Sequence, residues 1–173
     1  GIADNSYHVV TGSGTDNTAV LDGFTISDGN ADGGNPQNRG GGIYTSGSSQ
    51  AQFANLTISG NTATFGGGVF NDNSSPSYTN VTISGNTATF NNNVGGGGVF
   101  NDGGSPSYTN VTISGNTAPN NGDGGGVVNR GSPSYTNVTI SGNTANNSGG
   151  GVFNDTSSSA SYTNVTISGN TAT

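Results

Sequence analysis

Acidic side chains recur at one position of a repeated unit in this chain. They are Asp72, Asp102 and Asp155, and Arg130 takes the equivalent position in one copy. Clustered carboxylates bind Ca²⁺ or act as general acid and base, and stacked strands would bring Asp72 and Asp102 about 4.8 Å apart. The alternative is that each Asn-Asp pair caps backbone amides at a turn, with Arg130 relieving repulsion between like charges. We favour the structural role, because no second acidic cluster accompanies this aspartate column.

Charge and composition exclude several classes of function. The 173 residues include nine Asp, two Arg and no Lys, Glu or Cys, which gives a formal net charge of −7. Nucleic-acid binding is excluded, because a phosphate backbone would meet almost no positive charge. The one histidine, His8, cannot form a histidine-based metal site, and we expect it to pack in the first coil. We expect no enzymatic activity and no cofactor, with calcium as the one metal that the aspartates would accept.

A nine-residue phrase, Asn-Val-Thr-Ile-Ser-Gly-Asn-Thr-Ala, organises the chain. It starts at Asn80, Asn110, Asn137 and Asn164, and a copy with Leu in place of Val starts at Asn55. These copies are 25 to 30 residues apart. A period of this length is typical of stacked coils, in which each repeat contacts only its neighbours.

The composition favours a narrow core over a wide one. Only 27% of the side chains are hydrophobic and 33 residues are glycine, so little apolar area can offset the ordering entropy. Disorder is the alternative, but the net charge is modest and the apolar residues recur in register. Each repeat holds a Gly-Gly-Gly-apolar element and a Ser-Tyr-Thr-Asn-Val-Thr-Ile-Ser element, which both favour strands. We therefore expect an all-β solenoid of about six coils, with about three short strands in each.

Alternation with a period of two assigns the faces of these strands. In the segment from Val81 to Ser84, Val81 and Ile83 point inward while Thr82 and Ser84 point outward. The expected core stack is Val81, Ile83, Val111, Ile113, Val138, Ile140, Val165 and Ile167. The expected outer hydroxyl grid is Thr57, Thr82, Thr112, Thr139 and Thr166, with a serine two residues after each.

An amide ladder is expected inside the solenoid. One asparagine follows the inward valine of each glycine element by two positions, which places it on the same side of the strand. Each such side chain can bond its counterparts in the coils above and below and so satisfy buried polar groups. The expected inner ladder is Asn71, Asn101, Asn129 and Asn154.

The repeat resembles a known family. The run from Ile83 to Ala88, with the glycines at Gly66 and the pair Val99-Phe100, is similar to repeats of the right-handed parallel β-helix family, the pectin-lyase-like superfamily. It looks in particular like secreted bacterial surface proteins with polymorphic outer-membrane-type adhesin repeats. Their Phe-x-x-Asn is Ile-Ser-Gly-Asn here, and their Gly-Gly-Ala-Ile is Gly-Gly-Gly-Val. The resemblance implies an extracellular or cell-surface protein, but enzymes, adhesins and fibres share this scaffold.

The two ends of the expected solenoid favour self-association. We expect one domain, with an irregular first coil in residues 1–40 and regular repeats in residues 41–173, and no capping element is evident. The first strand would dock on the last coil of a neighbour, which builds a fibre or an adhesive surface stalk from head to tail. No apolar run is long enough for membrane insertion. The predicted contact residues are Tyr7, Val9, Val10, Ile167, Thr171 and Thr173.

Two other functions stay open beside a non-enzymatic extracellular structural protein. A carbohydrate-binding or polysaccharide-degrading β-helix would use the aspartate column, with surface polysaccharide as its ligand. A flat hydroxyl grid resembles the threonine arrays of ice-binding solenoids. Exposed strand positions, however, favour Thr and Ser in any case.

Overall fold

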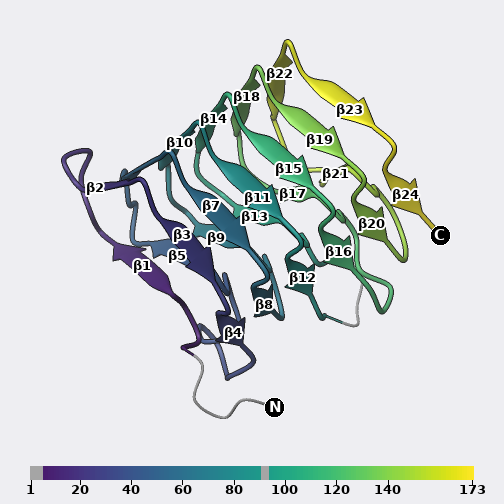
Figure 1. Cartoon of the computed structure of the whole chain (residues 1–173), viewed down its shortest axis with the longest axis horizontal. Helices are drawn as coiled ribbons and strands as arrows, with labels where there is room; N and C mark the ends of the chain where they lie inside the picture. The colour runs from purple at the N-terminus through teal and green to yellow at the C-terminus, as the bar shows by residue number, and fades with distance from the viewer. Residues whose placement is uncertain (1–5, 91–93) are drawn as a thin grey trace.

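A computed structural model describes residues 6–90 and 94–173 as a parallel β-solenoid (Figure 1). Its strands form four sheets of six strands each, and each coil supplies one strand to every sheet. About six coils were expected. Because each sheet has six strands, five full turns separate its first strand from its sixth. The described residues contain no helix, and hence no helix long and apolar enough to cross a membrane.

We name the four sheets A to D in the order in which each coil visits them. Sheet A contains β1 (Val10–Ser13), β5 (Ile43–Ser46), β9 (Val69–Asp72), β13 (Val99–Asp102), β17 (Val127–Asn129) and β21 (Val152–Asn154). Sheet B contains β2 (Val20–Asp22), β6 (Gln52–Ala54), β10 (Ser77–Thr79), β14 (Ser107–Thr109), β18 (Ser134–Thr136) and β22 (Ser161–Thr163).

The other two sheets come from the second half of each coil. Sheet C contains β3 (Thr25–Ser27), β7 (Thr57–Ser59), β11 (Thr82–Ser84), β15 (Thr112–Ser114), β19 (Thr139–Ser141) and β23 (Thr166–Ser168). Sheet D contains β4 (Asn30–Ala31), β8 (Thr62–Ala63), β12 (Thr87–Ala88), β16 (Thr117–Ala118), β20 (Thr144–Ala145) and β24 (Thr171–Ala172).

The all-β solenoid is confirmed, but the expectation of three strands in each coil was wrong. The Ser-Tyr-Thr-Asn-Val-Thr-Ile-Ser element is two strands rather than one, because Asn80 between them has a φ of 56°. A left-handed residue turns the chain and cannot continue a strand. A second left-handed residue, Gly85 with a φ of 62°, separates sheet C from the short strand of sheet D.

Identical residues stack on one another in successive coils. Ile58, Ile83, Ile113 and Ile140 pair in register along sheet C, although the loops between sheets D and A differ in length. Length differences are confined to the loops before and after sheet A, so they leave the register of the strands unchanged. A stack of this kind repeats about every 4.8 Å along the axis.

The core is a narrow column that runs the length of the solenoid. Val81, Ile83 and their copies in the next two coils are at most 2% exposed, while in the last coil Val165 is half-buried and Ile167 is 53% exposed. Sheet B adds a stack of tyrosine rings whose centroids are 4.8–5.1 Å apart. The stacked tyrosines are Tyr78, Tyr108, Tyr135 and Tyr162.

A second apolar cluster lies on the outer side of sheet A. Tyr44, Phe70, Phe100 and Val128 point away from the main core, yet each is at most 7% exposed. The loops that lead into sheet A fold over this face. They contain glycines, and because glycine has no side chain the loops approach the strands closely. At Gly66, for example, a Cβ would lie 2.3 Å from the carbonyl oxygen of Val69.

The first coil supplies one strand to each sheet, and β1 to β4 pair with the second coil in register. The segment before β1 bonds to its own chain. The N–H of Asn30 donates to the carbonyl of Ser6, and the N–H of Val9 donates to that of Gly41. Ile26, at the position of Ile167 in this coil, is only 2% exposed, so the two end coils differ in how well they are covered.

Candidate functional site

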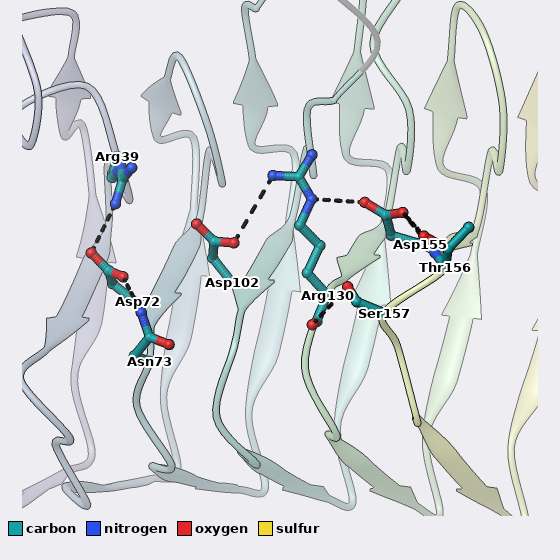
Figure 2. Close-up of polar contacts among 8 residues, drawn as sticks. All are labelled: Arg39, Asp72, Asn73, Asp102, Arg130, Asp155, Thr156 and Ser157. Atoms are coloured by element: carbon teal, nitrogen blue, oxygen red, sulfur yellow. Dashed lines mark hydrogen bonds and ion pairs between the residues drawn. The ribbon is translucent and has the colours of Figure 1, made fainter.

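The aspartate column lies on the outer face of sheet A, where β9 and β13 end (Figure 2). Asp72 and Asp102 are direct partners in the parallel register. Asp72 does not stand free, because Nη1 of Arg39 lies 2.8 Å from its Oδ2, and the Tyr44 hydroxyl donates to the same oxygen at 3.1 Å. The Asp72 carboxylate is therefore neutralised by the preceding coil.

Arg130 joins the two remaining carboxylates of the column, as Figure 2 shows. Its Nε lies 2.9 Å from Oδ2 of Asp155, and its Nη1 lies 3.9 Å from Oδ1 of Asp102. Its guanidinium also lies 5.3 Å from the ring centroid of Phe100, and Arg39 stacks in the same way 4.8 Å from Phe70. The two arginines thus cover the outer apolar cluster and pair with the aspartates at once.

Hydrogen bonds and the ion pair fix the charge state of Asp155. The Thr156 N–H, and then the Arg130 guanidinium, hold the pKa of Asp155 below its ordinary value, so this carboxylate stays ionised and is a poor proton donor. Among the described residues, no group of three or more His, Cys, Asp or Glu side chains is placed to hold a metal ion. Sequence reasoning missed Arg39, which lies in a loop outside the repeated positions and bears no periodic signal.

The inner ladder runs down the inward side of sheet A. Nδ2 of each asparagine donates to Oδ1 of its counterpart in the next coil at 2.7–2.9 Å, from Asn71 through Asn101 and Asn129 to Asn154. The stacked tyrosines join this network, since the hydroxyl of Tyr108 donates to Oδ1 of Asn101 at 2.8 Å. Burial raises the pKa of Tyr78 and Tyr135 well above the ordinary value, so these hydroxyls stay protonated.

A second buried ladder was not expected. The asparagines that follow Gly60, Gly85, Gly115 and Gly142 point inward, and the Nδ2 of each donates both to a backbone carbonyl and to Oδ1 of the asparagine in the next coil at 2.9–3.0 Å. A Gly-Asn pair predicts a turn, and this pattern alone does not indicate that the asparagine side chain points inward. The members of this second ladder are Asn61, Asn86, Asn116, Asn143 and Asn170.

The outer hydroxyl grid occupies the outward side of sheet C. Threonine pairs with threonine, and serine with serine, through all six strands. Thr57, Thr112, Thr139 and Thr166 are exposed and Thr82 is half-buried. An exposed asparagine ladder borders the grid at the corner with sheet B, with Nδ2 to Oδ1 distances of 3.1–3.3 Å. Its members are Asn55, Asn80, Asn110, Asn137 and Asn164.

The residues predicted to make contacts between copies lie at the two ends of the solenoid. Tyr7 is 46% exposed and Val9 is 42% exposed, whereas Val10 is half-buried and bonds through its N–H to Gly42. At the other end, Thr171 and Thr173 are exposed, as is Ile167. His8 stacks on Tyr44 with a centroid separation of 5.0 Å, and its Nδ1 lies 3.1 Å from the Gly40 carbonyl.

One segment of the repeat is similar to a described family. Residues 137–155 match the Chlamydia polymorphic membrane protein repeat. The matched segment starts at the exposed asparagine corner and runs through β19 and β20 to the end of β21. It therefore holds one copy of the second buried ladder, one glycine loop and one member of the aspartate column. No curated protein and no solved structure matches the chain.

Proposed function

We propose that this chain is a non-enzymatic structural β-solenoid of an extracellular or cell-surface protein, which stacks head to tail into a fibre or an adhesive stalk. The likeness of residues 137–155 to a membrane-protein repeat supports the surface location. The occupation of the aspartates by Arg39 and Arg130 supports a structural role for the column rather than catalysis.

The observation that carries the stacking is the equivalence of the interfaces between coils. The same isoleucine, tyrosine and asparagine meet their own copies from coil to coil, with rings about 5 Å apart and amides in hydrogen-bond contact. At the end of the last described coil these inward groups are exposed along the axis of the solenoid, and Ile167 is 53% exposed there. Such a surface accepts one further coil of the same pattern, from the same polypeptide or from a second copy.

The first coil offers a matching apolar surface. A hollow opens between β1 and β2, and Val10, Ala19, Leu21 and Phe53 are among the residues that line it. The apolar side chains of a neighbour's last coil would fill this hollow, while its strand edges continue sheets A, B and C, since Ser6 already bonds β4 at Asn30. This contact is heterologous, so repetition produces a linear assembly rather than a closed dimer.

Sedimentation and electron microscopy of the purified chain over a range of concentrations test the proposal. We expect species larger than one chain that grow with concentration. Ile167→Asp places a charge at the stacked end and should leave single chains, because a buried unpaired carboxylate is costly. Thr166→Asp is the matched control, since the neighbouring side chain points outward from the same strand. Single chains at every concentration of the unmodified protein would contradict head-to-tail stacking.

A further inference from the structure

The outer face of sheet C, from the second coil onward, is free of charge. After residue 52, the charged side chains are Asp72, Asp102, Asp123, Arg130 and Asp155. Asp72 and Asp102 end β9 and β13, Arg130 and Asp155 directly follow β17 and β21, and Asp123 lies in the loop between β16 and β17. A ligand on the five strands from β7 to β23 therefore meets only Thr, Ser, Asn and Gly, which disfavours ionic ligands, whereas Asp22 and Asp28 border β3 in the first coil.

This face is also regular, and the bends that follow its strands are open. The six strands of sheet C lie side by side in one layer (Figure 1). At the bend that follows each strand, a Cβ added to Gly60, Gly85, Gly115 or Gly142 would meet nothing within 4 Å, so no side chain rises above the sheet there. Threonine is β-branched and stiff at χ1, which fixes the direction of each hydroxyl oxygen and lowers the entropy lost on binding.

The outward hydroxyls keep their full hydrogen-bonding capacity. Within the described residues, Thr57, Thr82, Thr112 and Thr139 make no side-chain hydrogen bond to the protein, unlike Thr45, which donates to Asn71 at 2.7 Å. A hydroxyl both donates and accepts, as a water molecule does. The in-register strands repeat these groups about every 4.8 Å along the axis. The column of threonines and the column of serines two residues later are about 6.6 Å apart along the strand.

We propose that this face binds the surface of crystalline water, that is, ice. The face is a neutral array of groups that donate and accept hydrogen bonds, and the surface of ice is a neutral lattice of the same chemistry. The regular spacing of the hydroxyls calls for a ligand whose own groups are regularly spaced. A neutral polysaccharide shares the hydroxyl chemistry, but its sugar rings call for aromatic side chains to pack on. Among the described residues, the large exposed hydrophobic side chains are Tyr7, Val9, Val20, Phe24 and Ile167, which all lie in the first or the last coil. The proposal is independent of head-to-tail stacking, because the face is complete within one copy.

Thermal hysteresis and partition into slowly grown ice test the proposal on the full chain. The unmodified chain should lower the freezing point below the melting point and enter the ice. Thr112→Tyr places a ring in the middle of the face and should abolish both effects. Ser107→Tyr is the matched control, because it changes an outward position of sheet B in the same coil and should keep both. Circular dichroism verifies that both variants keep the fold.

Three outcomes would overturn the proposal. The unmodified chain could show neither hysteresis nor enrichment in ice. The two variants could lose these activities equally, which would place binding elsewhere on the surface. The chain could instead sediment with a microcrystalline neutral polysaccharide and not with ice, with Thr112→Tyr releasing it. That last result would assign the face to a carbohydrate. Failure of any kind leaves the sedimentation test of stacking unaffected, so the two proposals can be judged separately.

Discussion

Asn101 lies at the centre of the inner ladder and holds four side-chain neighbours. Its Oδ1 accepts from Asn71 and Tyr108, and its Nδ2 donates to Asn129 and lies 3.1 Å from the hydroxyl of Tyr135. We expect Asn101→Ala to lower the free energy of unfolding by about 2–4 kcal/mol, because buried donors and acceptors lose their partner. Urea denaturation followed by circular dichroism measures the change.

The exposed ladder supplies the control for this substitution. Asn110 bonds its copies in the same way, but its side chain meets water and its φ is 56°. Asn110→Gly keeps the left-handed bend and removes only solvent-exposed hydrogen bonds, so it should cost less than about 1 kcal/mol. If the two variants lost equal stability, burial of the ladder would not be what makes Asn101 important.

Asp123 carries the pH dependence that we expect at the scale of one residue. Burial raises its pKa above the ordinary value of 3.8, although the N–H of Ser148 donates to Oδ1 at 2.9 Å. Between 3.8 and the raised pKa the folded protein binds more protons than the unfolded chain, so the stability from this group falls as the pH rises from 3.8 through the raised pKa. Asp123→Asn keeps the acceptor and should raise the melting temperature near neutral pH, with little effect at acidic pH below 3.8.

Melting curves of both proteins across the acidic range measure this effect. An equal gain at every pH would show that the charge of Asp123 is not its cause. A loss of stability near neutral pH would show that the carboxylate makes a favourable contact that an amide cannot replace.

Sequence alternation predicts the core well between bends and fails across them. Val81 and Ile83 point inward as the period of two requires, and so does Asn71 after Val69. The left-handed Gly85 resets the phase, so Asn86 turns inward although counting from Ile83 would send it out. The fourth strand and the second buried ladder follow from such bends, and Gly-Asn alone does not reveal them.

The environment of the aspartate column could not be predicted from the repeat. The column itself follows from periodicity, as the register of Asp72 with Asp102 shows. Arg130 pairs with Asp102 and Asp155 from within the repeated position, but the pairing of Asp72 depends on Arg39, which comes from a loop outside the repeated pattern. Phe70 likewise belongs to the outward side of its strand, and only the return of the glycine loop buries it. Contacts between a regular element and an irregular one carry no periodic signal.

At the scale of the elements, the glycine runs allow the loops to lie against sheet A. A Cβ at Gly97 would lie 2.4 Å from the carbonyl oxygen of Gly125 and 2.6 Å from that of Thr117. Both oxygens belong to the backbone of neighbouring coils and cannot move aside. We therefore expect Gly97→Ala to lower the free energy of unfolding by about 3 kcal/mol, as overpacking does.

Gly34 is the matched control, since a Cβ there meets nothing within 4 Å and its φ is not in the left-handed region. Gly34→Ala should change stability by less than about 1 kcal/mol, with a slight gain from the stiffer unfolded chain. Equal stability of the two variants in urea would show that the loops do not need their close approach to the strands.

At the scale of the whole molecule, each coil is an interchangeable unit. Residues 80–109 form one period, because Ser77 pairs with Ser107 and Thr82 pairs with Thr112. Deletion of this segment joins Thr79 to Asn110, which reproduces the corner that Thr79 makes with Asn80. We expect the shortened chain to fold with five strands in each sheet and to melt at a lower temperature, because one interface between coils is lost.

Deletion of residues 80–94 is the contrasting variant. It removes half a period, so the strands that follow would reach the wrong sheet and present their polar side chains to the core. This chain should stay unfolded, as far-ultraviolet circular dichroism and proteolysis would show. If both deletions were equally disruptive, stability would depend on particular coils and not on the shared interface.

The first and last coils lie at opposite ends of the solenoid (Figure 1), and this bears on how the molecule carries load. A pull along the axis separates neighbouring coils, so it acts on the hydrogen bonds of one interface at a time while the others stay closed. Each rupture frees one period of 25 to 30 residues, which is roughly 85–100 Å of extended chain. Under a pulling force the solenoid would therefore unfold one coil at a time. Its length would increase in similar steps, and the molecule would not fail in a single event.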